Sequence, residues 1–279
     1  MRRSTTSVVT DHRRAADRRR LGAVLGAELI CAVLLVAGPD SSPSGPTLAA
    51  PSASATFATP ATVPALTSVT TPDGRQTQLV DLGAPDGAAL LASIAAELPA
   101  AVDAVSAFWG PQWRSDIEIV VAGSADQFAT LAAGGPDVAA TTTADRVMFS
   151  PAAGSMSDED LRIVLRHELF HYAARPATAA DAPVWLTEGV ADYVARPLVP
   201  TPARPAALPT DAELSAPGAG RSAAYDRAWQ FASFVAATFG ADKLRQVYVA
   251  ACGPGHRDVA TAVRDVLGVD LKTLTAGPS

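Results

Sequence analysis

The chain has 279 residues, and 48% of them are hydrophobic, which is enough to form the core of one large domain or two small ones. The net charge is −6; residues 1–20 carry +5, so the remaining chain carries −11. A body this acidic lacks the basic stripe that nucleic-acid binding requires, so we expect no nucleic-acid partner. The two cysteines, Cys31 and Cys252, leave too few thiolates for a zinc site built on cysteine.

The first 38 residues are typical of a membrane-targeting segment. Residues 1–20 form a basic head with seven arginines, and residues 21–38 are mostly apolar. Eighteen residues are just enough to span a bilayer, and the basic head would stay on the cytoplasmic side. We expect an uncleaved signal-anchor that holds the body outside the cell membrane. A cleaved signal peptide, which would give a secreted protein, and a lipoprotein are the alternatives.

The next segment differs sharply in composition. Residues 39–66 are rich in Pro, Ser, Ala and Thr and carry very little charge, so they cannot bury enough apolar surface to order themselves. We expect a semi-extended linker that separates a membrane anchor from a folded domain. We place that single domain at residues 67–279.

The first half of the domain alternates between strand and helix patterns. Alternating or β-branched runs predict strands, and runs with helical spacing predict helices, one of them interrupted by Pro99. In chain order we expect a strand at 75–82, a helix or two shorter helices at 87–110, a strand at 116–122, a helix at 124–134 and a strand at 145–151.

From residue 157 onward every pattern is helical. Ser157 and Asp160 have the spacing of a helix cap, and acidic residues fill the first turn. Further helices are expected at 184–195 and from near Ser222, Ala241 and Asp258. Strands and helices followed by helices alone predict an α+β fold, with a small mixed sheet on the N-terminal side and a helical C-terminal half.

Two of the four histidines lie in the sequence HELFH, at positions 167–171. On a helix, His167 and His171 project side by side and can reach one cation. Glu168 follows the first histidine directly, where it can act as a general base without being a ligand. The alternative is two ordinary surface histidines one turn apart.

A third ligand is needed, and Glu188 lies 17 residues after His171. Asp192, one turn further, is placed to accept the outer N–H of a ligating histidine. The alternative is a solvated acidic face. However, the apolar neighbours of these two residues indicate a buried helix, where unpaired carboxylates are costly.

The motifs HELFH and WLTEGVADY together resemble the gluzincin branch of zinc metallopeptidases, and in particular the peptidase-MA-like families. This resemblance implies a zincin-like fold, a Zn²⁺ ion held by His167, His171 and Glu188, and Glu168 as the base. It also implies a peptide or protein substrate lying along a sheet edge, which we expect at residues 145–151. The interval between His171 and Glu188 is slightly shorter than in the best-known gluzincins, so the connecting loop must be tight.

The expected reaction is zinc-dependent hydrolysis of peptide bonds. Glu168 would take a proton from the attacking water and pass it to the leaving amine. No oxyanion-stabilising residue follows from the resemblance; Tyr225 is a candidate, and a core phenol is at least as good an explanation for it. Two other functions stay open: a catalytically inactive zincin-like domain that serves as a binding module, and an amidase that acts on cell-wall peptides.

Overall fold

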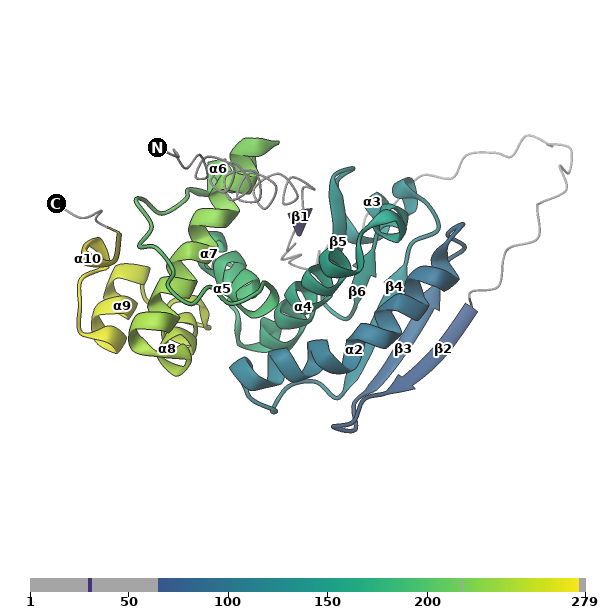
Figure 1. The fold of residues 1–279 in the computed structure, drawn as a ribbon, viewed down its shortest axis with the longest axis horizontal. Helices are drawn as coiled ribbons and strands as arrows, with labels where there is room; N and C mark the ends of the chain where they lie inside the picture. The colour runs from purple at the N-terminus through teal and green to yellow at the C-terminus, as the bar shows by residue number, and fades with distance from the viewer. Residues whose placement is uncertain (1–29, 32–64, 217, 276–279) are drawn as a thin grey trace, which may run out of the picture.

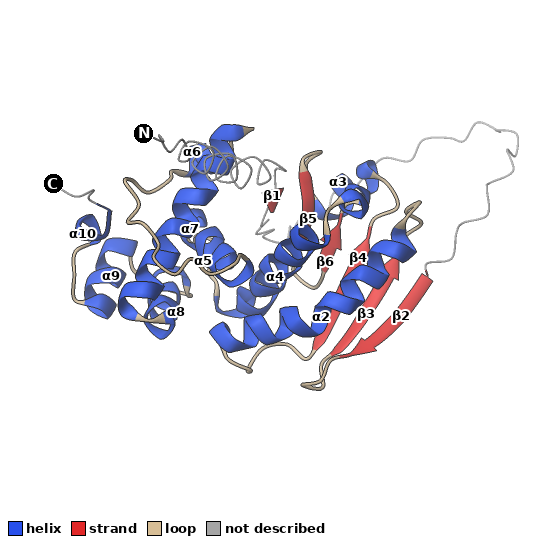
Figure 2. Ribbon diagram, in the orientation of Figure 1, coloured by secondary structure: helices blue, strands red, loops and turns tan. Residues whose placement is uncertain are grey.

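The computed structural model describes residues 30–31, 65–216 and 218–275. Within these residues, a mixed sheet and the helices on its two faces form one part of the molecule, and the C-terminal helices form the other (Figures 1 and 2). The strands are β1 (Ile30–Cys31), β2 (Ala65–Thr70), β3 (Gln76–Asp81), β4 (Asp116–Val121), β5 (Val138–Thr142) and β6 (Val147–Phe149). The longer helices are α2 (Gly87–Trp109), α3 (Ala125–Ala132), α4 (Asp158–Ala174), α5 (Val184–Ala195), α7 (Ala219–Phe239), α8 (Ala241–Cys252) and α9 (Val259–Leu267).

Short helical segments complete the described chain. They are the 3₁₀ turns η1 (Pro151–Ser155) and η2 (Arg175–Ala177) and the helices α6 (Asp211–Leu214) and α10 (Leu271–Thr275). After β6, the described residues contain no further strand, and the structure combines a mixed sheet with many helices, as an α+β fold requires. Of the two alternatives for residues 87–110, the structure shows the single helix: α2 runs through Pro99 without a break.

The sheet has the order β1-β5-β6-β4-β3-β2. The pairs β2–β3 and β5–β6 are antiparallel, and β3–β4, β4–β6 and β1–β5 are parallel. The prediction that residues 145–151 form an edge of the sheet is therefore wrong. Strand β6 lies inside the sheet, and β5, which the sequence patterns did not predict, lies on its outer side.

The chain before the domain is described only in part. Strand β2 begins at Ala65, two residues before the expected boundary at 67, and pairs with β3 along its whole length. Ile30 and Cys31, which belong to the apolar run 21–38, pair with β5. The basic head, the rest of that run and residues 39–64 lie outside the described residues.

Alternating side chains of the strands point to two different cores. Ile117, Ile119 and Val121 of β4 face α2 and α4, whereas Val120 faces α3 on the other side of the sheet. This period of two is what a sheet covered on both faces requires. By length and composition, helix α2 could cross a membrane. However, its buried hydrophobic residues belong to the core that α2 forms with α4 and the sheet.

Helix α4 begins with the cap that the sequence predicts. The Ser157 Oγ accepts a hydrogen bond from the Asp160 N–H at 3.1 Å, and Asp158, Glu159 and Asp160 occupy the first turn. Negative charge there is stabilised by the helix dipole. From Leu161 onward most of the helix is buried, so α4 carries its histidines into the interior.

Helix α5 lies between α4 and α7 (Figure 1), and its close approach to α7 depends on Gly189. A Cβ at Gly189 would lie 2.5 Å from the Ala228 carbonyl oxygen of α7, which is closer than any side chain tolerates. The glycine next to Glu188 therefore allows the two helix backbones to touch.

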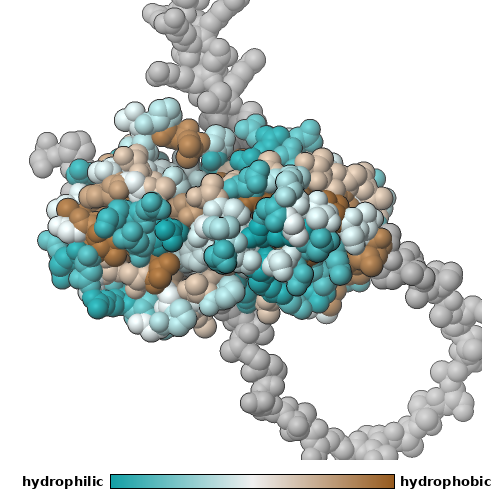
Figure 3. Space-filling view, turned by 90° about the horizontal axis from the view of Figure 1, so that it is seen from below, coloured by the Kyte–Doolittle hydropathy of each residue, from teal (hydrophilic) through white to brown (hydrophobic). Residues whose placement is uncertain are grey.

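The surface mixes polar and apolar side chains. On the face seen in Figure 3, hydrophobic patches are small and are separated by hydrophilic ones. The large hydrophobic side chains that are exposed come from separate parts of the described chain: Leu66, Leu131, Val184, Leu198, Val199 and Val249.

Candidate metal centre

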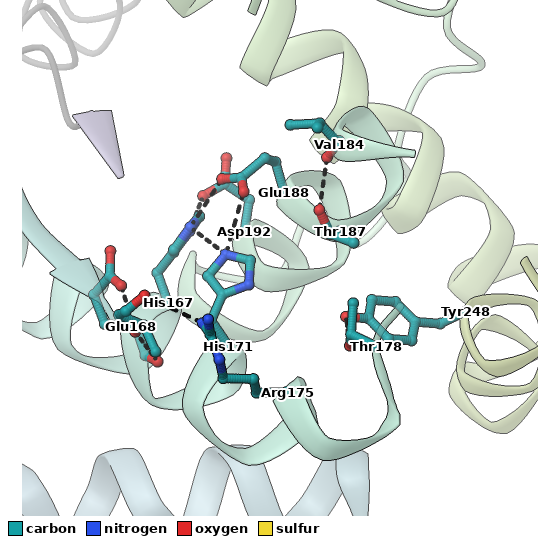
Figure 4. A network of polar contacts seen from close by, with 11 residues as sticks. His167, Glu168, His171, Arg175, Thr178, Val184, Thr187, Glu188, Asp192 and Tyr248 are labelled. Atoms are coloured by element: carbon teal, nitrogen blue, oxygen red, sulfur yellow. Dashed lines mark hydrogen bonds and ion pairs between the residues drawn. The ribbon is translucent and has the colours of Figure 1, made fainter. Parts of the chain in front are cut away.

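The two histidines of α4 meet Glu188 of α5 at one point (Figure 4). The Nε2 atoms of His167 and His171 are 3.0 Å apart. Glu188 Oε2 lies 3.2 Å from His167 Nε2, and Glu188 Oε1 lies 3.4 Å from His171 Nε2. All three side chains are buried. The structure thus brings together the three residues that the sequence analysis names as ligands.

These separations fit a zinc site. Zinc bonds of 2.0–2.2 Å in a tetrahedron place neighbouring ligand atoms about 3.4 Å apart. The three observed separations are at or slightly below that value, and two nitrogens plus one carboxylate oxygen form a donor set that zinc accepts. Apart from its 3.4 Å contact with His171 Nε2, Glu188 Oε1 has no hydrogen-bond partner among the described residues, although it is buried. A shared cation would satisfy it.

Asp192 defines the tautomer of His167. Its Oδ1 lies 2.9 Å from His167 Nδ1, and both groups are buried. An ionised carboxylate can only accept a hydrogen bond, so Nδ1 donates, and in a neutral imidazole Nε2 then keeps its lone pair. That lone pair faces the point where Glu188 and His171 converge. The contact between Asp192 and His167 that the sequence predicts is therefore present, and its support of a bound metal stays a prediction.

Arg196, which the sequence analysis missed, holds Asp192 from the other side. Its Nη2 lies 2.7 Å from Asp192 Oδ2, and its Nη1 lies 2.7 Å from Asp226 Oδ1 on α7. Burial lowers the pKa of Arg196, but the charges of Asp192 and Asp226 raise it overall. The i, i+4 spacing of Asp192 and Arg196 is a sequence signal that could have identified this pair.

Glu188 remains ionised in this environment. Burial alone would raise the pKa of its carboxyl group, but the charge of His171 and the polar contacts of both histidine rings with the carboxylate lower that pKa to about 2. A buried carboxylate with such a low pKa is available as an anionic ligand throughout the neutral range.

Glu168 is fully buried next to His167 on α4 (Figure 4). Its Oε2 accepts a hydrogen bond from Thr142 Oγ1 at 2.6 Å, and its Oε1 has no hydrogen-bond partner among the described residues. Thr142 was not identified from the sequence, because it lies on the unpredicted strand β5. Tyr225 is buried on α7, in the core, and its role in the reaction stays a prediction.

The connection between α4 and α5 is tight, as expected. It continues α4 through η2 and is fixed to α8 by two contacts. The Ala179 N–H donates to the Cys252 carbonyl at 2.7 Å, and Thr178 Oγ1 lies 2.9 Å from the Tyr248 hydroxyl. Contacts to α8 therefore hold the short loop in place.

No protein-family model matches the chain, and no curated protein matches it. Solved structures do match. One is a two-domain M1 zinc metallopeptidase bound to L-arginine, with a TM-score of 0.50 and 17% identity, over 77% of this chain and 52% of that one. Another is the Legionella pneumophila aminopeptidase A in complex with aspartic acid, with a TM-score of 0.49 and 14% identity, over 76% of this chain and 27% of that one.

A third is an M1 zinc metallopeptidase from Deinococcus radiodurans, with a TM-score of 0.48 and 17% identity, over 76% of this chain and 50% of that one. This chain spans about half the length of the first structure. At 17% identity, the similarity to that structure concerns the fold alone.

Proposed function

We propose that the protein is a zinc-dependent peptidase, with His167, His171 and Glu188 as metal ligands and Glu168 as general base. The observation that carries this proposal is the convergence of two histidine nitrogens and a carboxylate within 3.0–3.4 Å in a buried site. Two imidazole lone pairs and a negative oxygen repel one another, so their approach is favourable only around a shared cation or proton. The zinc-peptidase fold of the first matching structure supports the same conclusion.

Bound Zn²⁺ would supply Lewis-acid polarisation of a peptide carbonyl and would lower the pKa of a water ligand. Glu168 takes the proton of the attacking water and returns it to the leaving amine. Asp192 keeps His167 in the ligating tautomer, and Glu188 contributes the negative charge that makes the site selective for a divalent cation. Peptides or proteins are the proposed substrates.

We also propose that the peptidase is tethered to a membrane with its catalytic part outside. The support is the basic head at 1–20, the apolar run at 21–38 and the linker-like composition that follows. Ile30 and Cys31 cannot lie in a bilayer and pair with β5 at once, so the tethered form must leave that edge of β5 free. Protease accessibility in membrane vesicles distinguishes a tethered domain from a secreted one.

The test of the peptidase proposal separates ligands from base. The 279-residue chain is purified, its zinc content is measured by mass spectrometry, and its activity is measured on a peptide library and on a panel of aminoacyl-p-nitroanilides. We expect one zinc per chain and hydrolysis. His167→Ala and Glu188→Ala should lose both. Glu168→Gln should keep the zinc and lose at least about a hundredfold in kcat.

Two results would contradict the proposal. Stoichiometric zinc without any Glu168-dependent hydrolysis would favour the inactive binding module. Zinc content that is unchanged in both ligand variants would show that the metal, if any, binds elsewhere. Hydrolysis of cell-wall peptides with no activity on protein-derived peptides would keep the chemistry and redirect the substrate assignment to an amidase.

A further inference from the structure

Strand β5 ends against the middle of helix α4, at Thr142. The Thr142 Oγ1 lies 2.6 Å from Glu168 Oε2 and 2.9 Å from the Glu168 carbonyl oxygen. Both residues are fully buried. Because 26 positions separate them in the chain, this contact exists only once the sheet and the helix have packed together.

The geometry leaves the Thr142 hydroxyl little freedom. It has one proton to donate, and both nearby atoms are acceptors that belong to Glu168. The bond to the carboxylate oxygen is the shorter one, as expected for a charge-assisted hydrogen bond. The β-branched side chain of threonine is stiff at χ1. In addition, the Thr142 carbonyl accepts a hydrogen bond from Arg175 Nη1 at 3.4 Å, which ties the strand end to the end of α4.

The two oxygens of Glu168 are consequently in different situations. Oε2 is bound to Thr142, whereas Oε1 has no hydrogen-bond partner in the part of the chain that is described, although it is buried. A carboxylate with one oxygen fixed cannot rotate freely about its last bond. Its other oxygen is then held in one direction, with no donor bound to it among the described residues.

We propose that Thr142 is a positioning residue for Glu168: its hydroxyl fixes Oε2, so that Oε1 is the oxygen that accepts the proton of the attacking water. This inference rests on the proposed peptidase function and assigns a new residue to it. Thr142 touches neither the substrate nor the metal ligands in this role. It acts through the orientation of Glu168.

The neighbouring residue provides a matched control. Thr141 is as deeply buried as Thr142, but its Oγ1 has no hydrogen-bond partner among the described residues. Replacing either threonine by valine keeps the shape and removes one hydroxyl. Only at Thr142 does that hydroxyl contact Glu168, so the two variants separate positioning of the base from general effects of a changed strand.

The first measurement is steady-state kinetics of the full chain with the best peptide from the library. We expect Thr142→Val to lower kcat about 10- to 100-fold, with KM and zinc content within about twofold of the parent, because a small displacement of a catalytic group costs up to about a hundredfold. Thr142→Ser should restore kcat to within about fivefold. Thr141→Val should match the parent. A Thr142→Val variant with the same kcat as the parent would overturn this inference and leave the proposed peptidase function standing.

The second measurement does not depend on activity. Thermal unfolding of the metal-free chain is followed for Thr142→Val, Glu168→Leu and the double variant. If the hydroxyl binds the carboxylate, the loss of Tm in the double variant should be smaller than the sum of the single losses by about 3 °C or more. Additive losses would overturn the inference even if the enzyme is active. Coupled losses in a parent that hydrolyses no peptide would instead overturn the proposed function, and the catalytic role of Thr142 with it.

Discussion

Asp192 and Arg196 form an ion pair one helical turn apart, with 2.7 Å between Oδ2 and Nη2. The same carboxylate holds His167 through its other oxygen, and the same guanidinium reaches Asp226 on α7. The guanidinium also lies over the ring of Trp229 on α7, 5.2 Å from its centre. A chain of contacts therefore runs from α7 through α5 to a proposed metal ligand on α4.

Asp192→Asn should weaken zinc binding about 10- to 100-fold, the usual cost of losing a residue that supports a metal ligand. An amide can donate to Nδ1 as well as accept from it, so it no longer enforces the tautomer with a free Nε2. The measurement is a zinc competition titration against a chromogenic chelator.

Asp226→Asn serves as the control for that variant. It removes the negative charge of the other carboxylate that Arg196 contacts but leaves Asp192 in contact with His167. Because Asp226 is more than half exposed, the variant should change zinc affinity by less than about threefold. An equal loss in the two variants would mean that Asp192 acts only through general packing of α5.

Gly189→Ala should destabilise the protein by about 1–3 kcal/mol, the usual cost of overpacking a core. The new methyl group would meet the Ala228 carbonyl, which is backbone and cannot rotate away. Helix α5 must then move from α7, and Glu188 moves with it, so zinc affinity should fall as well. Thermal unfolding and the zinc titration measure the two effects.

Gly220→Ala is the matched comparison. Gly220 lies in the first turn of α7, and an added Cβ would meet nothing within 4 Å. Alanine is the better helix former, so this variant should keep or raise the stability by up to about 1 kcal/mol. If Gly189→Ala behaved in the same way, the close packing of α5 on α7 would be refuted.

The ion pair between Glu97 of α2 and Arg162 of α4 should make stability depend on acid pH. Two hydrogen bonds of 2.9 and 3.1 Å to Arg162 lower the pKa of Glu97 below its ordinary value of 4.5. The folded-state pKa is thus below the unfolded one. The stabilisation is complete above about pH 4.5 and is lost as pH falls through the folded-state pKa.

Glu97→Gln tests this sign in metal-free protein. The variant should unfold at a lower temperature than the parent at pH 7, and the difference should shrink as the pH falls below 4.5. Because both side chains are partly exposed, the difference should also shrink in high salt. If the difference in unfolding temperature grew toward acid pH, the stabilising role of ionised Glu97 would be contradicted.

The sequence predicts the elements whose signals are local. Helix α4 follows from its cap and spacing, and the HELFH spacing places His167, Glu168 and His171 on it. Glu188 could be predicted as a further ligand because its apolar neighbours imply a buried helix. Strand β5 could not be predicted, since its sequence VAATT has no alternation of polar and apolar residues. It is a strand because it pairs with β6 and β1, which are distant or separate segments of the chain.

The order of the strands in the sheet could not be predicted from local sequence patterns either. Residues 145–151 were correctly expected to form a strand but were wrongly placed at the edge, because which strand pairs with which depends on contacts between distant segments. The same reason explains why Thr142 was missed. Its partner Glu168 lies on another element, and nothing near Thr142 in the chain marks it as different from Thr141 or Thr143.

The contact between Ala179 and Cys252 has a consequence for how short the protein can be made. Every group proposed to bind the ion or move a proton lies before residue 195, yet the turn that joins the two ligand-bearing helices is fastened to a helix near the end of the chain. Truncating the polypeptide after α5 would keep the three proposed ligands and the proposed base. It would remove α8, which holds the turn that sets the distance between α4 and α5.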